Sequence, residues 1–377
     1  MSPYDDKWRK YRKLFHQNFR ADVSTEYQPI EIKQVQKFLE AINSSDMSLR
    51  DQISTLSQIV MFNAIYGLDI ATNKEDMSQH ARDIIDLNDF LFLPGWDAFK
   101  YIPFIHLLPS WLPGGQYRVA HEKIDETLGA TIEGPWLQTL SAMKSDKDHS
   151  SLVAKLITEK PEGEYSAEDM DRIKNMGMQA VAAAADTTMS AICTFFLAMG
   201  LYPEVQLKAQ QELDCILGPG KLPKFSDRSS LPYVEAVYRE VMRWHPALPV
   251  GVPHASIADV YYKGYYIPQG TIISANIWAM THDESTFESP GHDFIPERHL
   301  GKNENINSIL AYGFGRRVCS GRYMAHDTTW ITIASVLVAM EITIDTLPHE
   351  TLEDYFSDGS FCSTKSLDYC KVKPRFP

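Results

Sequence analysis

The chain has 377 residues, and its 36 Lys and Arg against 49 Asp and Glu give a net charge of −13. A hydrophobic fraction of 44% with 23% charged residues is ordinary for a globular protein and excludes a disordered or fibrous chain. The acidic balance argues against general nucleic-acid binding, and five cysteines without a CxxC pair do not make a disulfide framework or a zinc ribbon.

Most of the first two-thirds of the chain is predicted to be helical, because apolar residues recur there at three- and four-residue spacing. The first predicted helices cover about Glu31–Ile42, Asp51–Leu68, Ser78–Leu93 and Tyr117–Lys144. The segment Leu91–Gly115 cannot be continuous helix, since proline recurs through it. A surface loop that packs aromatic side chains is a plainer interpretation of this segment than a binding site.

A long central helix is predicted from Ser166 to about Met199. Ser166 and Asp169 resemble a capping pair at its start, and Tyr202–Pro203 marks its end. Its middle, QAVAAAADTTMSAI, consists almost entirely of small residues with one acidic residue among them. Two shorter helices are predicted to follow, over about Glu204–Ile216 and Leu231–Trp244.

After Pro246 the pattern changes to short β-branched and aromatic runs with turn signals. Val260–Trp278 predicts a small sheet with hairpins, and one last helix is predicted over about Met324–Glu341 before a tail with strand character. No linker separates independent domains. We therefore expect a mainly α fold with a minor β region, formed by a single domain that covers residues 1–377.

The sharpest motif is the run YGFGRRVCSGRYMA over Tyr312–Ala325. Gly313 and Gly315 precede Cys319, and Gly321 follows it just before the last predicted helix. Glycine allows the backbone to turn tightly and brings amide groups close to the sulfur. The run therefore predicts a special environment for one cysteine.

A cysteine at a helix N-terminus beside Arg316 and Arg317 is expected to be a thiolate. A buried structural cysteine in a glycine-rich turn is the alternative. It would not explain the paired arginines and the flanking glycines together. The remaining cysteines carry no such pattern and are interpreted as bystanders: Cys193, Cys215, Cys362 and Cys370.

This run closely resembles the haem-binding signature FxxGxRxCxG of the cytochrome P-450 family. Gly315, Arg317, Cys319 and Gly321 match it at the required spacing, and Tyr312 stands where the family usually has Phe. The resemblance implies that Cys319 is the axial ligand of a haem iron and that the cofactor is haem b, iron protoporphyrin IX. It also implies that Gly315, Gly321 and Arg317 belong to the haem-binding residues.

Two further runs together resemble the Glu-Arg-Arg triad of the family. In YREVMRWHP, Glu240 and Arg243 are three residues apart and share one helix face, a spacing that is common on solvated faces. The run FIPERHL supplies Arg298. A buried ionic network adds little net stability, but the loss of one member is strongly destabilising. The resemblance implies that the three residues hold the cysteine loop and take no part in the chemistry.

The run AAADTT in the middle of the long helix resembles the AGxDT pattern of the family. Asp186 and Thr187 match its acid–alcohol pair, which relays protons during oxygen activation, and Ala184 replaces the usual glycine. The alternative is a packing face of small residues, with Thr bonding its own backbone. Beside the haem signature, the relay is the favoured interpretation.

The run KWRKYRK near the start of the chain resembles the WxxxR segment that reaches a haem propionate in the family. Trp8 and Arg12 match it, and Arg317 and His254 are the other propionate candidates. A lone histidine after a proline is usually only a polar surface residue. No histidine has metal-ligand spacing, so we expect no second metal.

Family members usually carry further residues before the WxxxR helix, including a membrane anchor and the first β-strands. The resemblance therefore implies an N-terminally truncated member. The runs FIPERHL and GFGRRVCSGRYMA are most similar to those of fungal members of secondary metabolism. Full-length members lie on the cytosolic face of the endoplasmic reticulum membrane. The charged start MSPYDDKWRKYRK is not a signal peptide, and no apolar run reaches the ~18 residues of a membrane helix. We expect this chain to be cytosolic or peripheral.

The resemblance implies a haem-thiolate monooxygenase that inserts one atom of molecular oxygen into a small apolar substrate. Electrons would come from NADPH through a reductase, and we expect a monomer. No sequence rule identifies the substrate. A basic stripe on the first helix suits an acidic redox partner, although such stripes are usually solvated faces: Lys7, Arg9, Lys10, Arg12 and Lys13. The expected pocket walls are Phe90–Phe104, the central helix, Leu248–Val252 and Ser357–Phe361.

Two other functions stay open. A haem-thiolate isomerase, dehydratase or peroxide-using enzyme shares the fold and needs no reductase, but the presence of both Asp186 and Thr187 argues against it. A catalytically inactive haem-binding fragment is the second alternative, favoured by the missing first strands. The visible spectrum of the reduced protein with carbon monoxide distinguishes a haem-thiolate enzyme from an inactive fragment without haem. NADPH consumption with added reductase then separates a monooxygenase from an isomerase.

Overall fold

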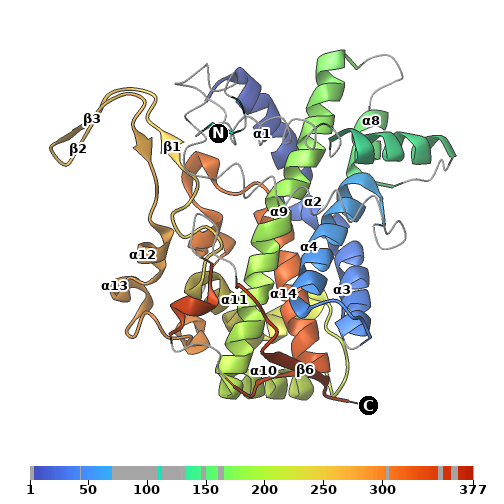
Figure 1. The fold of residues 1–377 in the computed structure, drawn as a ribbon, viewed down its shortest axis with the longest axis vertical. Coiled ribbons are helices and arrows are strands. Elements are labelled where there is room, and N and C mark those ends of the chain that lie inside the picture. The colour runs from blue at the N-terminus through green and yellow to red at the C-terminus, as the bar shows by residue number, and fades with distance from the viewer. Residues whose placement is uncertain are drawn as a thin grey trace. The chain divides into compact units, whose positions relative to one another are not determined.

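The structure, a computed structural model, is mainly helical with three small antiparallel sheets among the residues that it describes (Figure 1). These are residues 4–42, 44–69, 109, 111–112, 129, 132–145, 150–159, 165–302, 305–346, 351–357 and 364–376. The predicted fold class is confirmed. The main helices are α1 (Asp6–Phe19), α3 (Gln28–Ile42), α4 (Leu49–Tyr66), α8 (Leu152–Thr158), α9 (Ala167–Leu201), α10 (Pro203–Ile216), α11 (Pro232–Trp244) and α14 (Arg322–Ala339).

Short helical turns and strands connect the main helices. The turns are α2 (Ala21–Ser24), η1 (Thr25–Tyr27), η3 (Phe225–Ser230), α12 (Ile277–Thr281), α13 (Glu284–Phe287), η4 (Pro296–His299), η5 (Ile306–Ser308), η6 (Leu310–Tyr312), η7 (Gly315–Arg317) and η8 (Glu353–Tyr355). The strands are β1 (His254–Ala255), β2 (Val260–Tyr262), β3 (Tyr265–Ile267), β4 (Ile272–Ile273), β5 (Met340–Ile344) and β6 (Cys370–Pro374).

The predicted helices that fall on described residues are confirmed as α3, α4, α9, α10, α11 and α14. At the start of α9 the capping pair forms as expected, because the Asp169 amide donates to Ser166 Oγ at 3.1 Å. The last helix ends earlier than predicted: Met340 begins β5, which pairs with the C-terminal β6. The Ser78–Leu93 helix lies outside the described residues, as do nearly all of Leu91–Gly115 and the first part of Tyr117–Lys144.

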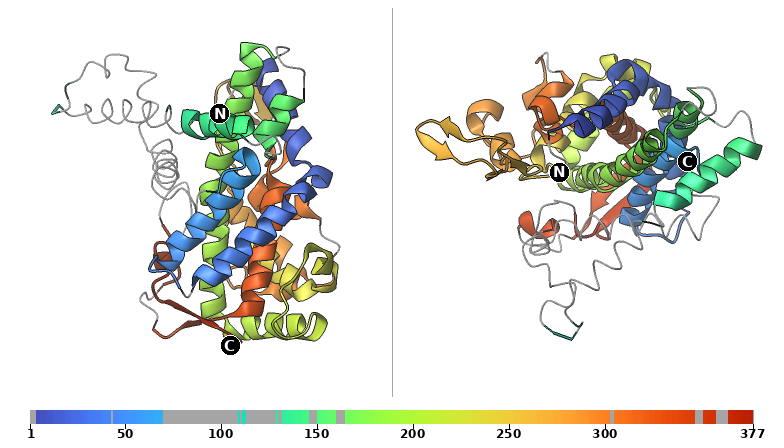
Figure 2. Two further views of the ribbon diagram at one scale, coloured as in Figure 1. Left: turned by 90° about the vertical axis from the view of Figure 1, so that its right-hand side faces the viewer. Right: turned by 90° about the horizontal axis from the view of Figure 1, so that it is seen from above.

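The chain divides into two compact units, one made of Met1–Leu56 with Thr187–Pro377 and the other of Ser57–Asp186. In the first unit, α14 packs against α3, α10 and α11, an arrangement visible in Figures 1 and 2. Its core contains large side chains with almost no exposed surface: Phe195, Phe196, Trp244, Phe294 and Trp330. This unit carries the cysteine loop.

In the second unit, the end of α4 lies close against the first half of α9. A Cβ atom at Gly177 would come within 2.8 Å of the Tyr66 hydroxyl, so any larger residue would force the buried Tyr66 side chain to shift. The Ser57 hydroxyl donates to the Ala185 carbonyl at 2.8 Å, and Thr139 donates to the Tyr66 carbonyl at 3.0 Å. These contacts fix the part of α9 that ends at Asp186.

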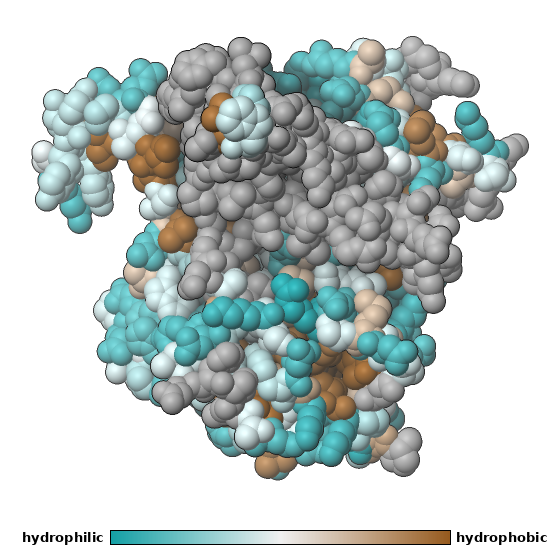
Figure 3. Space-filling model, viewed as in Figure 1, coloured by the Kyte–Doolittle hydropathy of each residue, from teal (hydrophilic) through white to brown (hydrophobic). Residues whose placement is uncertain are grey.

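The β region after Pro246 consists of two hairpin-like pairs, β1 with β4 and β2 with β3. The turn between β2 and β3 uses Lys263 and Gly264, both with positive φ, as a two-residue hairpin loop requires. Trp278, predicted in this sheet, instead lies in α12. Ile257 and Ile272 in this region are 74% and 67% exposed. Figure 3 shows apolar surface on this side of the molecule.

The central helix α9 is long and apolar enough to cross a membrane by length and composition, although no such segment was expected from the apolar runs of the sequence. Within the structure, 78% of its most apolar stretch is buried. Burial of this kind is typical of a core helix in a water-soluble fold.

Candidate functional site

The cysteine loop runs from Tyr312 to the start of α14, and two glycines shape it. Gly313 and Gly315 have φ of +69° and +68°, a left-handed conformation that strongly favours glycine. The Cys319 amide donates to the Tyr312 carbonyl at 2.9 Å, which closes the loop. Gly321 then caps α14. The tight turn that the sequence predicted is therefore present.

Cys319 is accessible from one side, although protein atoms surround its sulfur closely. This burial raises the pKa of the thiol, and the Gly321 amide with the charges of Arg12 and Arg322 only partly offsets it. The raised pKa favours the neutral thiol while no metal ion is bound. A coordinated metal ion deprotonates a thiol outright, so the thiolate belongs to the metal-bound form.

The two adjacent arginines point to aromatic rings of the N-terminal segment. The Arg317 guanidinium lies 4.4 Å from the centre of the Trp8 ring, and Arg316 lies 5.6 Å from that of Tyr4. Cation–π contacts of this kind hold the loop and the start of α1 together. Trp8 and Arg317, both predicted haem-binding residues, are thus brought into contact.

Arg12 joins α1 directly to the backbone of the cysteine loop. Its guanidinium donates to Ser320 Oγ at 2.5 Å and to the Val318 carbonyl at 2.7 Å. The motif that predicted a propionate contact therefore also places Arg12 beside Cys319. His254 lies elsewhere, exposed in β1 opposite Ile273.

Glu240, Arg243 and Arg298 meet in one buried ionic cluster. Arg243 Nε and Nη2 donate to the two Glu240 carboxylate oxygens at 2.7 and 2.8 Å, and Arg298 Nε donates at 3.0 Å. His299 is a fourth member that no sequence motif indicated: its Nε2 lies 3.0 Å from Glu240 Oε2. Its position directly after Arg298 was the available signal.

The remaining N–H groups of the two arginines in this cluster donate hydrogen bonds to backbone carbonyls. Arg243 donates to the carbonyls of Thr281, Gly291 and Asp293 at 2.7–3.0 Å. Arg298 reaches the carbonyls of residues 287, 288, 290 and 293. The hydrogen bonds of the cluster thus tie α11 to residues 281–298, so any support that it gives the cysteine loop is indirect.

Acid is expected to weaken this cluster below about pH 4.5. Burial alone would raise the pKa of Glu240, but hydrogen bonds from Arg243 and His299 hold it at about 2, against an ordinary value of 4.5. Because the folded pKa is the lower one, the stabilisation is complete above the unfolded pKa and is lost as pH falls toward the folded pKa.

Urea unfolding of the wild type and Glu240→Gln at about pH 7 and about pH 3 measures this loss. The stability difference between the two proteins should shrink at the lower pH. A difference that stays constant would contradict the low pKa of Glu240.

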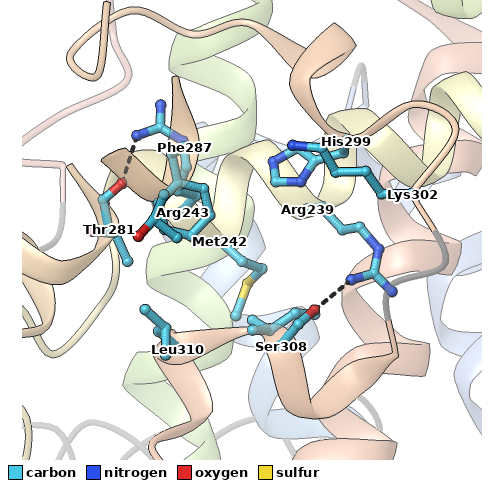
Figure 4. Close-up of a pocket in the computed structure, with 11 residues that line it drawn as sticks. Arg239, Met242, Arg243, Thr281, Phe287, His299, Lys302, Ser308 and Leu310 are labelled. Atoms are coloured by element: carbon cyan, nitrogen blue, oxygen red, sulfur yellow. Dashed lines mark hydrogen bonds between the residues drawn. The ribbon is translucent and has the colours of Figure 1, made fainter. Parts of the chain in front are cut away.

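A cavity of about 200 Å³ lies beside this cluster (Figure 4). Figure 4 shows the Arg239 guanidinium directed toward Ser308, whose hydroxyl it approaches to 3.3 Å. Cys319 and the central helix do not line this cavity. It is distinct from the expected substrate pocket, whose predicted walls Phe90–Phe104 and residues 358–361 lie outside the described residues.

Asp186 and Thr187 lie half-buried in the middle of α9, as predicted. The boundary between the two compact units falls between them. Their neighbour Thr188 is buried, so the helix presents a different face at each of these positions.

The residues around Cys319 fit a haem. A Cβ atom built on Gly313, Gly315 or Gly321 would meet nothing within 4 Å, which leaves room for a flat group against the loop. Phe314 presents an apolar ring that is 52% exposed. The accessible sulfur supplies a soft ligand, and the guanidinium of Arg12 is close enough to the loop to attract an acidic substituent.

A mainly helical fold with a glycine-shaped cysteine loop and a buried Glu-Arg-Arg cluster defines a haem-thiolate protein. The sequence model of the family described as cytochrome P-450 matches residues 1–370. The chain belongs to this family. It is accordingly a cytochrome P-450 monooxygenase, an oxidoreductase with a haem-thiolate cofactor.

Fungal proteins are among the relatives that the chain matches over most of its length. The chain is 34% identical to cytochrome P-450 monooxygenase ple1 of Rhodocybe pseudopiperita, with 100% of this chain and 73% of that protein covered. It is 31% identical to cytochrome P-450 monooxygenase 136 of Postia placenta, with 90% of this chain and 65% of that protein covered. The structure of a zebra fish cytochrome P-450 with progesterone is similar to this one, with a TM-score of 0.77 at 22% sequence identity. The match covers 99% of this chain and 84% of that chain, and it confirms the fold.

Proposed function

We propose that this protein inserts one atom of molecular oxygen into a small apolar substrate, with Cys319 as the axial ligand of haem b. The observation that carries the proposal is the accessible sulfur of Cys319 in a glycine-shaped loop at the start of α14. When bound, the haem supplies the oxygen chemistry, and thiolate ligation favours O–O cleavage. The protein supplies the ligand, the pocket and the protons.

We propose that residues of the cysteine loop and of helix α1 hold the haem. Gly315 and Gly321 leave room for the macrocycle. Trp8, Arg12 and Arg317 are the proposed propionate contacts at the loop, and His254 on β1 is a fourth candidate. Arginine suits this role because its planar guanidinium binds carboxylates bidentately.

The Glu240–Arg243–Arg298 cluster is proposed as structural support for the cysteine loop. It acts through α11, which packs against both η6 and α14, the elements on either side of the loop. We also propose that residues 1–377 work as a single domain, since the family match runs across both compact units.

Electrons are proposed to arrive from NADPH through a flavoprotein reductase. Helix α1 carries Lys7, Lys10 and Lys13, and its Arg12 contacts the loop backbone beside Cys319. A basic surface near the cysteine suits an acidic redox partner. We further propose a monomer at the cytosolic face of the endoplasmic reticulum membrane that acts in fungal secondary metabolism.

Asp186 and Thr187 are proposed to move protons into the site. Replacing Thr187 with alanine should leave haem binding intact and lower the rate of product formation by roughly 100-fold, the lower end of what positioned proton transfer contributes. NADPH consumption should continue, with its electrons appearing as hydrogen peroxide. Thr188→Ala is the matched control, and an unchanged product yield in Thr187→Ala would leave the pair as packing residues.

NADPH consumption by the haem-loaded protein with added reductase tests the proposed reaction. Consumption that depends on both oxygen and the protein supports a monooxygenase. A haem-thiolate protein that consumes no NADPH with any candidate substrate would instead be an isomerase or dehydratase. A protein that binds no haem would be an inactive fragment.

A further inference from the structure

A buried chain of hydrogen bonds joins three residues around the cysteine loop. The hydroxyls of Tyr312 and Tyr238 lie 3.0 Å apart, and the Tyr238 hydroxyl lies 2.8 Å from His326 Nδ1. Tyr312 stands where the family usually has Phe, so its hydroxyl is not needed for apolar packing. A buried hydroxyl without a partner is costly, and here Tyr238 provides the partner.

The direction of this chain follows from its outer end. Arg228 Nη2 lies 3.4 Å from His326 Nδ1, and a guanidinium can only donate, so Nδ1 is an acceptor. Burial, with the charges of Arg228 and Arg239, lowers the pKa of His326 to about 2, so the ring is neutral. The Tyr238 hydroxyl, at 2.8 Å, is therefore the principal donor to the single lone pair of Nδ1, with Arg228 as a weaker second donor, and the Tyr238 oxygen accepts from Tyr312.

The three residues sit on both flanks of the cysteine. Tyr312 lies seven residues before Cys319 and His326 lies seven residues after it, on α14. The Tyr312 carbonyl also accepts the Cys319 amide at 2.9 Å. Tyr238 belongs to α11, so a single hydroxyl from another helix connects the beginning of the loop to the helix that follows it.

The outer end of the chain is fixed by ion pairs. Arg228 Nη2 lies 2.8 Å from Glu235 Oε2, and its Nη1 lies 3.4 Å from Asp327 Oδ1. The guanidinium also lies 4.8 Å from the centre of the Trp330 ring. These contacts hold the Arg228 guanidinium in place beside His326 Nδ1.

We propose that the hydroxyl of Tyr238 is a positioning group for Cys319, which holds the two flanks of its loop at a fixed separation. The inference rests on the proposed role of Cys319 as the haem ligand. Loss of this hydroxyl leaves the Tyr312 donor without its acceptor and lets the loop relax. The thiolate–iron bond should then be lost under conditions in which the rest of the fold persists.

Tyr238→Phe tests the proposal, because it removes one oxygen and keeps the ring. The rate at which the holoprotein loses its red-shifted carbon monoxide band in mild urea should rise about tenfold, near the lower end of the effect of losing the two buried hydrogen bonds of this hydroxyl. Global unfolding, followed by far-ultraviolet circular dichroism, should change less. Tyr233→Phe is the matched control, since its hydroxyl lies on the same helix but bonds Glu297 at 3.0 Å.

Tyr312→Phe gives a second variant should Tyr238→Phe fail to fold. It removes only the donor at the end of the chain and should accelerate band loss by a smaller factor. The double variant should lose the band no faster than Tyr238→Phe alone, because the same hydrogen bond is removed.

The outcomes separate the two proposals. Suppose that the wild type shows the red-shifted band and that Tyr238→Phe and Tyr312→Phe both lose it no faster than Tyr233→Phe. This result overturns the positioning role alone. Band loss that merely parallels global unfolding in both variants also overturns it. A wild type without the band overturns the role of Cys319 and this inference with it.

Discussion

Replacing Cys319 with alanine is expected to abolish haem-thiolate character. Among the cysteines that the structure describes, Cys319 is the only one with glycines on both sides and a hydrogen bond from its own amide that closes a glycine-shaped loop. Alanine offers no ligand atom, so reduced protein with carbon monoxide should show no strongly red-shifted Soret band. Because the thiol is accessible, the substitution should affect haem binding far more than packing.

The other cysteines supply the controls for this experiment. Cys193 is fully buried with its thiol pKa raised to about 12 by burial, and Cys215 is exposed, so neither is placed as a ligand. Alanine at Cys193, Cys215 or Cys370 should leave the band intact, as should alanine at Cys362, which lies outside the described residues. A red-shifted band retained in Cys319→Ala would remove this residue from the site.

Replacing Glu240 with alanine is expected to destabilise the protein by about 3–5 kcal/mol, the usual effect of breaking a buried ion pair. The side chains of Arg243 and Arg298 are only 2% and 3% exposed, so both guanidiniums would stay buried without their counter-charge. Urea unfolding followed by circular dichroism measures the loss. The network would be dispensable for stability if the variant unfolded at the wild-type urea concentration.

An exposed ion pair provides the comparison. Lys371 pairs with Asp345 on the surface, where both side chains are more than half exposed. Lys371→Ala should lower the stability far less than Glu240→Ala, because solvent screens exposed pairs. If Lys371→Ala and Glu240→Ala lowered the free energy of unfolding by comparable amounts, the effect would come from the loss of charge in general and not from burial.

Local spacing was enough to predict much of the fold. The capping pair Ser166–Asp169 and the three- and four-residue apolar periods depend on neighbours in the chain, so α3, α4, α9, α10, α11 and α14 could be placed from sequence. The end of α14 could not, because Met340 leaves the helix to pair with Pro374. That pairing is a long-range contact without a local signal.

The candidate site was predictable as a set of residues but not as a geometry. The bidentate Glu240–Arg243 pair follows from helix spacing, whereas His299 joins it only because η4 folds back onto α11. Arg12 reaches the loop across more than 300 residues of sequence. The raised pKa of Cys319 likewise reflects burial, which the neighbouring Arg316 and Arg317 could not reveal.

The visible spectrum of the purified, reduced protein with carbon monoxide tests the haem-thiolate assignment most directly. A thiolate from Cys319 should move the Soret band strongly to the red, since no neutral ligand donates as much electron density to the iron. We expect this red-shifted band in the wild type after loading with haem. A haem-loaded protein with an unshifted band, or a protein that takes up no haem, would contradict the assignment.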